Sequence, residues 1–98
     1  MTLPDLKRSA ADLARKNRVT LAGLFMEYGI LERTVNFALN GSAIDLVTAK
    51  RMLPLVARLS APGEPAALEC NLPTGAAVVM SPETFAELRA KFFSHQPN

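Results

Sequence analysis

The sequence TLAGLFMEYGILERTVNFALNG, residues 20–41, decides the fold of the N-terminal half of this 98-residue chain. Its apolar residues recur at intervals of three and four on both sides of Gly29, which places them on one side of a helix in each half. Thr20 can cap the first helix, and Gly29 can adopt the left-handed conformation that ends it. Asn40 and Gly41 can end the second helix in the same way. The stretch therefore predicts two short helices joined by a tight turn.

This stretch resembles the helix-turn-helix of the lambda-repressor-like and Lac-repressor-like DNA-binding proteins. The apolar positions of their twenty-residue motif are filled here by Leu24, Tyr28, Ile30, Val35 and Ala38. Gly29 stands at the turn, and TVNFALNG is similar to the end of the Lac-type recognition helix. With the flanking helices, the resemblance extends over residues 3–59. It implies a mainly α, lambda-repressor-like domain of five short helices that binds double-stranded DNA.

Two positions depart from that family pattern. Phe25 stands where the family usually has a small residue, because the two helices approach closely there. Its presence predicts a wider helix crossing or a shifted register, with Ala22 and Gly23 giving the close approach. Leu31 stands where a serine or threonine usually caps the recognition helix, so we expect this helix to be weakly capped.

The second helix carries the candidate DNA-reading side chains on the side away from Val35, Ala38 and Leu39. The candidate base contacts are Glu32, Arg33, Asn36, Phe37 and Asn40. Arginine can bind the guanine edge twice, asparagine the adenine edge, glutamate the cytosine amine, and an aromatic edge the thymine methyl. The candidate phosphate contacts are Thr20, Thr34, Ser42, Lys50 and Arg51. The alternative is an ordinary solvated helix face, against which an exposed Phe37 argues.

The rest of the first sixty residues predicts further short helices. Thr2 and Pro4 can start a helix that ends near Asn17. After the recognition helix, we expect a helix that stops near Leu53 and a new one that starts at Pro54, because proline breaks interior hydrogen bonds. The cations of the first helix have two interpretations, phosphate contact or helix solubility with dipole compensation, and the sequence leaves both open.

The C-terminal third has a different pattern. Residues 61–65 contain two prolines and a glycine and predict a linker between a DNA-binding domain, residues 1–60, and a second segment, residues 66–98. Alternation in residues 68–72 and an apolar run in residues 76–80 predict two strands joined by a turn, followed by a helix. This segment is too short to bury a core alone, so it either packs back on the helices or pairs with a second copy.

We expect residues 66–98 to form the dimer and residues 1–60 to fold without them. The candidate dimerisation residues are Leu68, Cys70, Leu72, Val78, Met80, Phe85, Leu88 and Phe92. The apolar residues of the C-terminal helix recur at helical spacing, and the N-terminal core has little room to bury them.

Charge is distributed unevenly along the chain. Residues 1–60 carry nine Lys and Arg against five Asp and Glu, whereas residues 61–98 carry two against four. A basic half beside an acidic half indicates that one surface meets a polyanion and the other does not. Two ordinary solvated surfaces are the alternative, and charge alone does not decide between them.

Several classes of protein are disfavoured by the sequence. It has no apolar run as long as a membrane span and no signal-peptide pattern at its start, so we expect a cytoplasmic protein. One cysteine, Cys70, and one histidine, His95, cannot form an internal disulfide or a typical zinc site. We find no nucleophile–base pair, no supported carboxylate pair and no phosphate-binding glycine loop. We therefore expect no enzyme activity, no metal and no cofactor.

The sequence favours a dimeric, sequence-specific protein that binds double-stranded DNA as a transcriptional repressor on a palindromic operator, from a plasmid, phage or bacterial regulatory circuit. Its expected partners are operator DNA and a second copy of the chain. The alternative is an antitoxin-like interaction module whose acidic C-terminal segment binds and neutralises a partner protein. The stretch AVVMSPETFAELRA, residues 77–90, is faintly similar to the strand-then-helix of Phd-type antitoxins.

Overall fold

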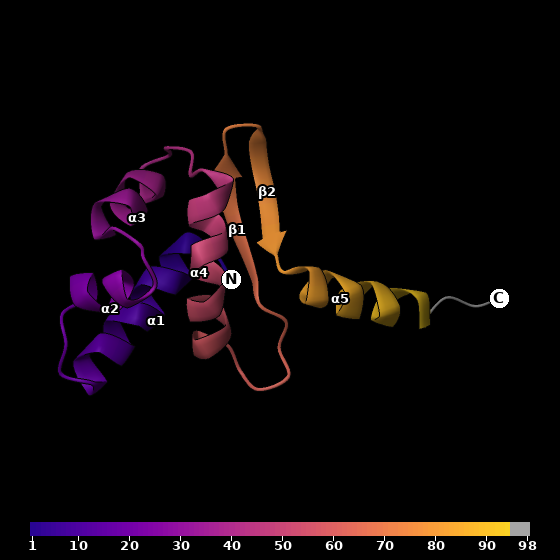
Figure 1. Ribbon diagram of the computed structural model, residues 1–98, viewed down its shortest axis with the longest axis horizontal. Coiled ribbons are helices and arrows are strands. Elements are labelled where there is room, and N and C mark those ends of the chain that lie inside the picture. The colour runs from indigo at the N-terminus through magenta and orange to yellow at the C-terminus, as the bar shows by residue number, and fades with distance from the viewer. Residues whose placement is uncertain (95–98) are drawn as a thin grey trace.

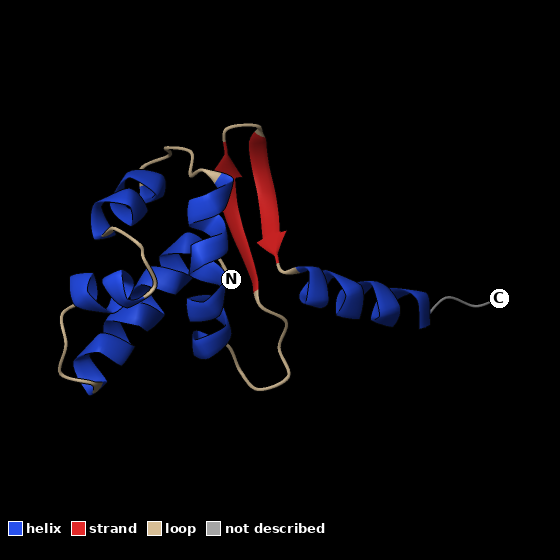
Figure 2. Cartoon of the chain, viewed as in Figure 1, coloured by secondary structure: helices blue, strands red, loops and turns tan. Residues whose placement is uncertain are grey.

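The computed structural model describes residues 1–94, which form five helices and a two-stranded hairpin (Figures 1 and 2). Four helices come before the hairpin: α1 (Leu3–Lys16), α2 (Leu21–Glu27), α3 (Glu32–Leu39) and α4 (Leu46–Leu59). The strands β1 (Ala67–Leu72) and β2 (Gly75–Met80) follow, and α5 (Pro82–Ser94) ends the described chain. The predicted mainly helical domain with a hairpin and a C-terminal helix is confirmed. Residues 95–98, including His95, lie outside the described residues.

Side-chain caps start three of the first four helices. Thr2 and Thr20 cap α1 and α2 by accepting a hydrogen bond from the backbone N–H three residues further on, at 3.3 and 2.9 Å. Asp45 caps α4 through Thr48, and the hydrogen bonds from the side chain and then the backbone of Thr48 lower the pKa of the Asp45 carboxyl. Leu31 precedes α3 and makes no side-chain cap, as expected from its apolar side chain.

Helix α4 runs without interruption through Pro54, so the predicted stop near Leu53 and restart at Pro54 are wrong. Pro54 is exposed, and water can bond the Lys50 carbonyl that a proline at this position leaves without its helical donor. Buried residues lie on both sides of it, with Met52 and Leu55 fully enclosed. Burial of this apolar face outweighs the roughly 3 kcal/mol cost of an interior proline.

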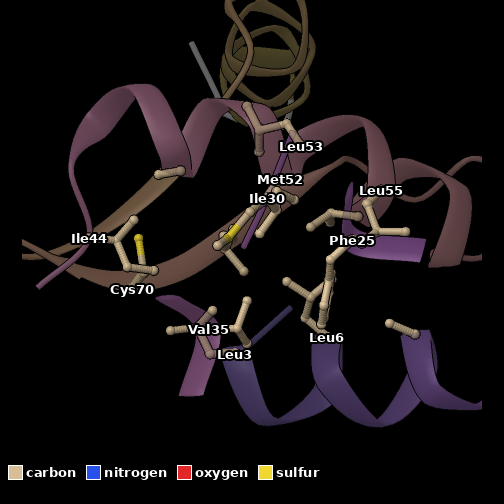
Figure 3. Close-up of a cluster of buried hydrophobic side chains, with 14 of the residues drawn as sticks. Leu3, Leu6, Phe25, Ile30, Val35, Ile44, Met52, Leu53, Leu55 and Cys70 are labelled. Carbon is tan, nitrogen blue, oxygen red and sulfur yellow. The ribbon is translucent and has the colours of Figure 1, made fainter. Parts of the chain in front are cut away.

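One hydrophobic core joins the helices to the hairpin. Figure 3 shows Leu6, Phe25 and Met52 converging from α1, α2 and α4, with Cys70 of β1 beside Ile44 in the same cluster. The loop at residues 61–65 therefore does not separate two cores, and the hairpin packs back on the helices. The sequence leaves open whether the C-terminal segment packs back on the helices or pairs with a second copy, and the hairpin takes the first arrangement.

Strand β1 lies between two partners. It pairs antiparallel with β2, from Ala67 opposite Met80 to Leu72 opposite Gly75. On its other edge, the Met1 ammonium group donates to the Ala67 carbonyl at 2.9 Å, and a parallel bridge joins Thr2 to Glu69. The N-terminus thus covers this edge of β1, while β2 forms the outer edge of the hairpin.

The candidate dimerisation residues divide into two groups. Leu68 is fully buried and Cys70 nearly so, both within the chain's own core, so their assignment to a dimer interface is wrong. Leu72 packs against the same core. The strand alternation correctly predicts one buried face, but it does not distinguish a core of the same chain from a partner. The residues with exposed or half-exposed side chains are Val78, Met80, Phe85, Leu88 and Phe92.

Helix α5 projects from the body of the molecule, at the far end from α2 and α3 (Figure 1). Ser81 caps it by accepting a hydrogen bond from the Thr84 N–H at 3.1 Å, and Thr84 is buried at the root of the helix. Beyond this root, its aromatic side chains lie in solvent. Within the described residues, no helix is both long enough and apolar enough to cross a membrane.

Candidate nucleic-acid interface

Helices α2 and α3 are joined by the tight turn that the sequence predicts. Gly29 has a φ of +73°, the left-handed conformation that a residue without a Cβ adopts most easily. Ile30 follows, is fully buried, and donates its backbone N–H to the Phe25 carbonyl at 3.0 Å. Gly41, with a φ of +102°, ends α3 in the same way. The buried Ile30 fixes the turn against the core and thereby sets the position of α3.

The contact between α2 and α3 does not use the small residues that the sequence points to. Ala22 and Gly23 are exposed, and a Cβ built on Gly23 would meet only the Thr20 hydroxyl, at 3.0 Å. Their expected role in a close helix approach is therefore wrong. Phe25 instead fills the centre of the core, where it is fully buried among side chains of the other helices.

Three of the five candidate base-contacting residues form the outer face of α3. Arg33, Phe37 and Asn40 follow one another at intervals of four and three, so they share one stripe of the helix. All three are exposed, and Phe37 leaves 61% of its surface in solvent. The opposite side of α3 is anchored by Val35 and Ala38, which are buried. This stripe therefore faces away from the body of the molecule.

The other two candidates, Glu32 and Asn36, are half-buried on the flank of α3. The ammonium group of Lys7 on α1 donates to the Asn36 side-chain oxygen at 2.6 Å. Because an ammonium group only donates, its partner must be the amide oxygen, and the amide NH₂ is the group left to donate outward. An adenine contact through both amide atoms is therefore less favourable at Asn36 than the sequence implies. Lys7 lies 29 residues from Asn36 in the sequence, so no local sequence pattern indicates this hydrogen bond.

The candidate phosphate contacts do not form one surface. Thr20 and Ser42 are exposed, and Thr34 is half-buried. Arg51 lies beside the turn, with its Cδ 3.6 Å from the position that a Cβ of Gly29 would occupy. Lys50 instead lines a hollow between α4, the end of β2 and the root of α5. Adjacent helical residues point about 100° apart, so one member of this basic pair faces the α2–α3 turn and the other faces α5.

A second cation beside the turn is Arg58, which the sequence interpretation did not include. Its guanidinium donates to the Tyr28 hydroxyl at 3.0 Å and lies 3.9 Å from the Glu27 carboxylate. Arg51 and Arg58 are seven residues apart and so lie on the same side of α4. This spacing of seven residues in the sequence could have predicted that the two arginines lie together.

Other chemistry has little support in residues 1–94. They contain no group of three or more side chains suited to hold a metal ion. Burial raises the pKa of the Cys70 thiol, which keeps it protonated and weakly nucleophilic. The surface built by α3 is therefore the feature that requires a functional explanation. Comparison with protein families, with curated proteins and with solved structures gives no match for this chain.

Proposed function

We propose that this chain is a sequence-specific protein that binds double-stranded DNA through a helix-turn-helix formed by α2 and α3. The observation that carries the proposal is the outer stripe of α3, on which Arg33, Phe37 and Asn40 stand exposed opposite the buried Val35 and Ala38. A half-exposed aromatic ring between an arginine and an asparagine is unfavourable in water and well suited to a groove that offers both polar edges and methyl groups.

The stripe supplies groups for direct reading of the major groove. The Arg33 guanidinium can donate two hydrogen bonds to the O6 and N7 atoms of guanine. Phe37 can pack on a thymine methyl, and the amides of Asn36 and Asn40 can donate to acceptors at neighbouring base pairs. Arg51 and Arg58 lie beside the turn, and their guanidinium groups can contact the phosphates that flank the groove.

Occupation of an operator is the simplest regulatory action for such a protein, so we propose that it acts as a transcriptional repressor. One recognition helix reads only a few base pairs, and specific sites therefore combine two copies on a pseudo-palindrome. Selection of binding sites from random duplexes, followed by a footprint, tests the function directly. Failure to enrich any sequence from the random pool would contradict it.

Arg33→Ala should weaken binding to the selected duplex by about 1–3 kcal/mol, because it removes a two-bond contact to a base. Binding to a scrambled duplex of the same length should change much less. Fluorescence anisotropy on both duplexes, at one fixed salt concentration, measures the difference. Equal losses on the two duplexes would remove Arg33 from the base-reading residues. The thermal melt should not change, because the side chain is exposed.

Arg51→Ala and Lys50→Ala form a matched pair for the phosphate contacts. Both remove one positive charge from an exposed position of α4, but only Arg51 lies beside the α2–α3 turn. Arg51→Ala should reduce the slope of log binding constant against log salt by about 1 and weaken binding to every sequence. Lys50→Ala should leave the slope nearly unchanged, since Lys50 faces the root of α5. Equal slopes for both variants would place the DNA elsewhere on the molecule.

A further inference from the structure

The exposed side of α5 is not explained by the folding of a single chain. Phe85, Phe92 and Phe93 leave 56%, 63% and 54% of their surface in solvent. With Leu88, Met80 and Arg89 they line one hollow that is mainly apolar, and the Arg89 guanidinium lies over the Phe93 ring, 5.5 Å from its centre. Aromatic side chains gathered at this density on a small protein mark a binding surface. The helix is held to the body only at its root, so its apolar side is open along most of its length (Figure 1).

We propose that this side of α5 binds the α5 of a second copy of the chain, with the two helices parallel. Phe85, Leu88 and Phe92 are spaced by three and four residues, the spacing at which two helices pack side by side along one seam. Glu83 and Glu87 lie on the other side of the helix and stay in water. Each copy presents the same stripe, so a two-fold axis along the seam makes the surface self-complementary.

The area of this surface matches a small, weakly associating dimer. A fully covered aromatic side chain buries about 150–250 Å². Three half-exposed phenylalanines with the half-buried Leu88 and Met80 therefore remove about 300–500 Å² of surface on each chain, or about 600–1,000 Å² in the complex, which reaches the lower limit for a specific interface only when all five side chains are covered. The interface is modest, so we expect association in the micromolar range of chain concentration.

The strands offer less for such a contact. The edge of β1 is covered by β2 on one side and by Met1 and Thr2 on the other, and Leu68 and Cys70 are buried. Strand β2 retains an unpaired outer edge of six residues, which is long enough to pair with a second copy. Charge substitutions in α5 distinguish the two interfaces, because they should abolish a dimer formed through α5 and leave one formed through this edge intact.

The parallel orientation rests on the proposed function. Figure 1 shows α2 and α3 at one end of the molecule and α5 at the other, along the 51 Å axis. Antiparallel pairing of α5 would send the two α3 stripes to opposite ends of the dimer, where they could not contact one duplex. Parallel pairing puts both bodies at the same end of the seam, so that both stripes can face the same DNA.

Sedimentation of the full chain tests the interface without DNA. We expect twice the 10.6 kDa chain mass at tens of micromolar, and the chain mass alone for Phe92→Glu and for Phe85→Glu. The control is Ala90→Glu, which adds the same charge on the exposed opposite side of α5 and should remain a dimer. All variants should melt like the parent at a concentration where the parent is monomeric. A monomeric parent, or dimeric phenylalanine variants, would overturn the proposal.

Spin labels on α2 test the orientation. Met26 is exposed, and Met26→Cys in a Cys70→Ala background gives one label on each chain. Parallel pairing keeps the two labels at the same end of the dimer, so we expect a short separation, near the roughly 34 Å between half-sites where the proposed function holds. Antiparallel pairing places them more than about 60 Å apart, because the molecule is 51 Å long and the helices overlap by only about 20 Å.

Failure of the dimer inference and failure of the proposed function give different results. A dimer with the long separation would overturn the parallel arrangement and leave α5 as the interface. A dimer with the short separation that selects no DNA sequence would support this inference and contradict the proposed function. A parent that is monomeric but co-purifies with a different protein through Phe92 would overturn the self-association and favour the antitoxin-like alternative.

Discussion

Leu68→Ala should lower the free energy of unfolding of the whole molecule, helices included, by about 2–5 kcal/mol. Leu68 is fully buried where β1 meets the helices, so the substitution leaves a cavity in the shared core. A loss of this size corresponds to a fall in melting temperature of about 10–30 °C for a domain of this length. The far-UV circular dichroism of the helices, followed during heating or in urea, measures it.

Val78→Ala is the matched control for Leu68→Ala. Val78 lies on β2 with 51% of its surface exposed, on the face of the hairpin that points away from the core, and we expect a change within about 0.5 kcal/mol. If Leu68→Ala left the helical melt unchanged, the hairpin would be a separate unit.

Truncation after Ser60 should unfold the chain, because it removes β1 and β2 and uncovers the part of the core that they close.

Gly29→Val should destabilise the molecule by about 1–3 kcal/mol and weaken DNA binding beyond that loss. The φ of +73° is unfavourable for any residue with a Cβ and most unfavourable for a β-branched one. A Cβ here would meet Arg51 Cδ at 3.6 Å, an ordinary contact, so the cost arises from the backbone and not from crowding. Because the turn positions α3, a shift of the turn also displaces Arg33 and Phe37.

Gly29→Asn is the control, since asparagine enters the left-handed region more easily than valine. We expect the melting temperatures to fall in the order glycine, asparagine, valine. Equal melting temperatures for the three proteins would mean that residue 29 does not hold this conformation in solution. Anisotropy on the selected duplex, measured well below each melting temperature, separates the effect on binding from the effect on stability.

Local chemistry determined most of the secondary structure of this chain. Thr2 and Thr20 cap helices because their hydroxyls reach a backbone N–H three residues away. The glycine at position 29 ends α2, and the alternation around Leu68 gives a strand with one buried face. Each of these effects acts within a few residues, so the sequence is enough to find it. At Pro54 the local rule failed, because burial on both sides of the proline outweighs its cost.

The candidate site follows the same division. The stripe of Arg33, Phe37 and Asn40 was predictable, because helical periodicity alone puts these residues opposite Val35 and Ala38. The hydrogen bond from Lys7 to Asn36 was not predictable, since it joins residues of two helices that are 29 positions apart in the sequence.

The sequence by itself determined most of the helices, turns and strands and which side of α3 is polar, because these properties depend on caps, glycine conformation and periodicity over a few residues. Only the tertiary structure decided what each apolar face covers. It placed Leu68 and Cys70 in the core, left Phe85 and Phe92 in solvent, and separated Lys50 from Arg51. The reason is that burial depends on contacts between segments distant along the chain, and the pattern of one segment does not encode its partner.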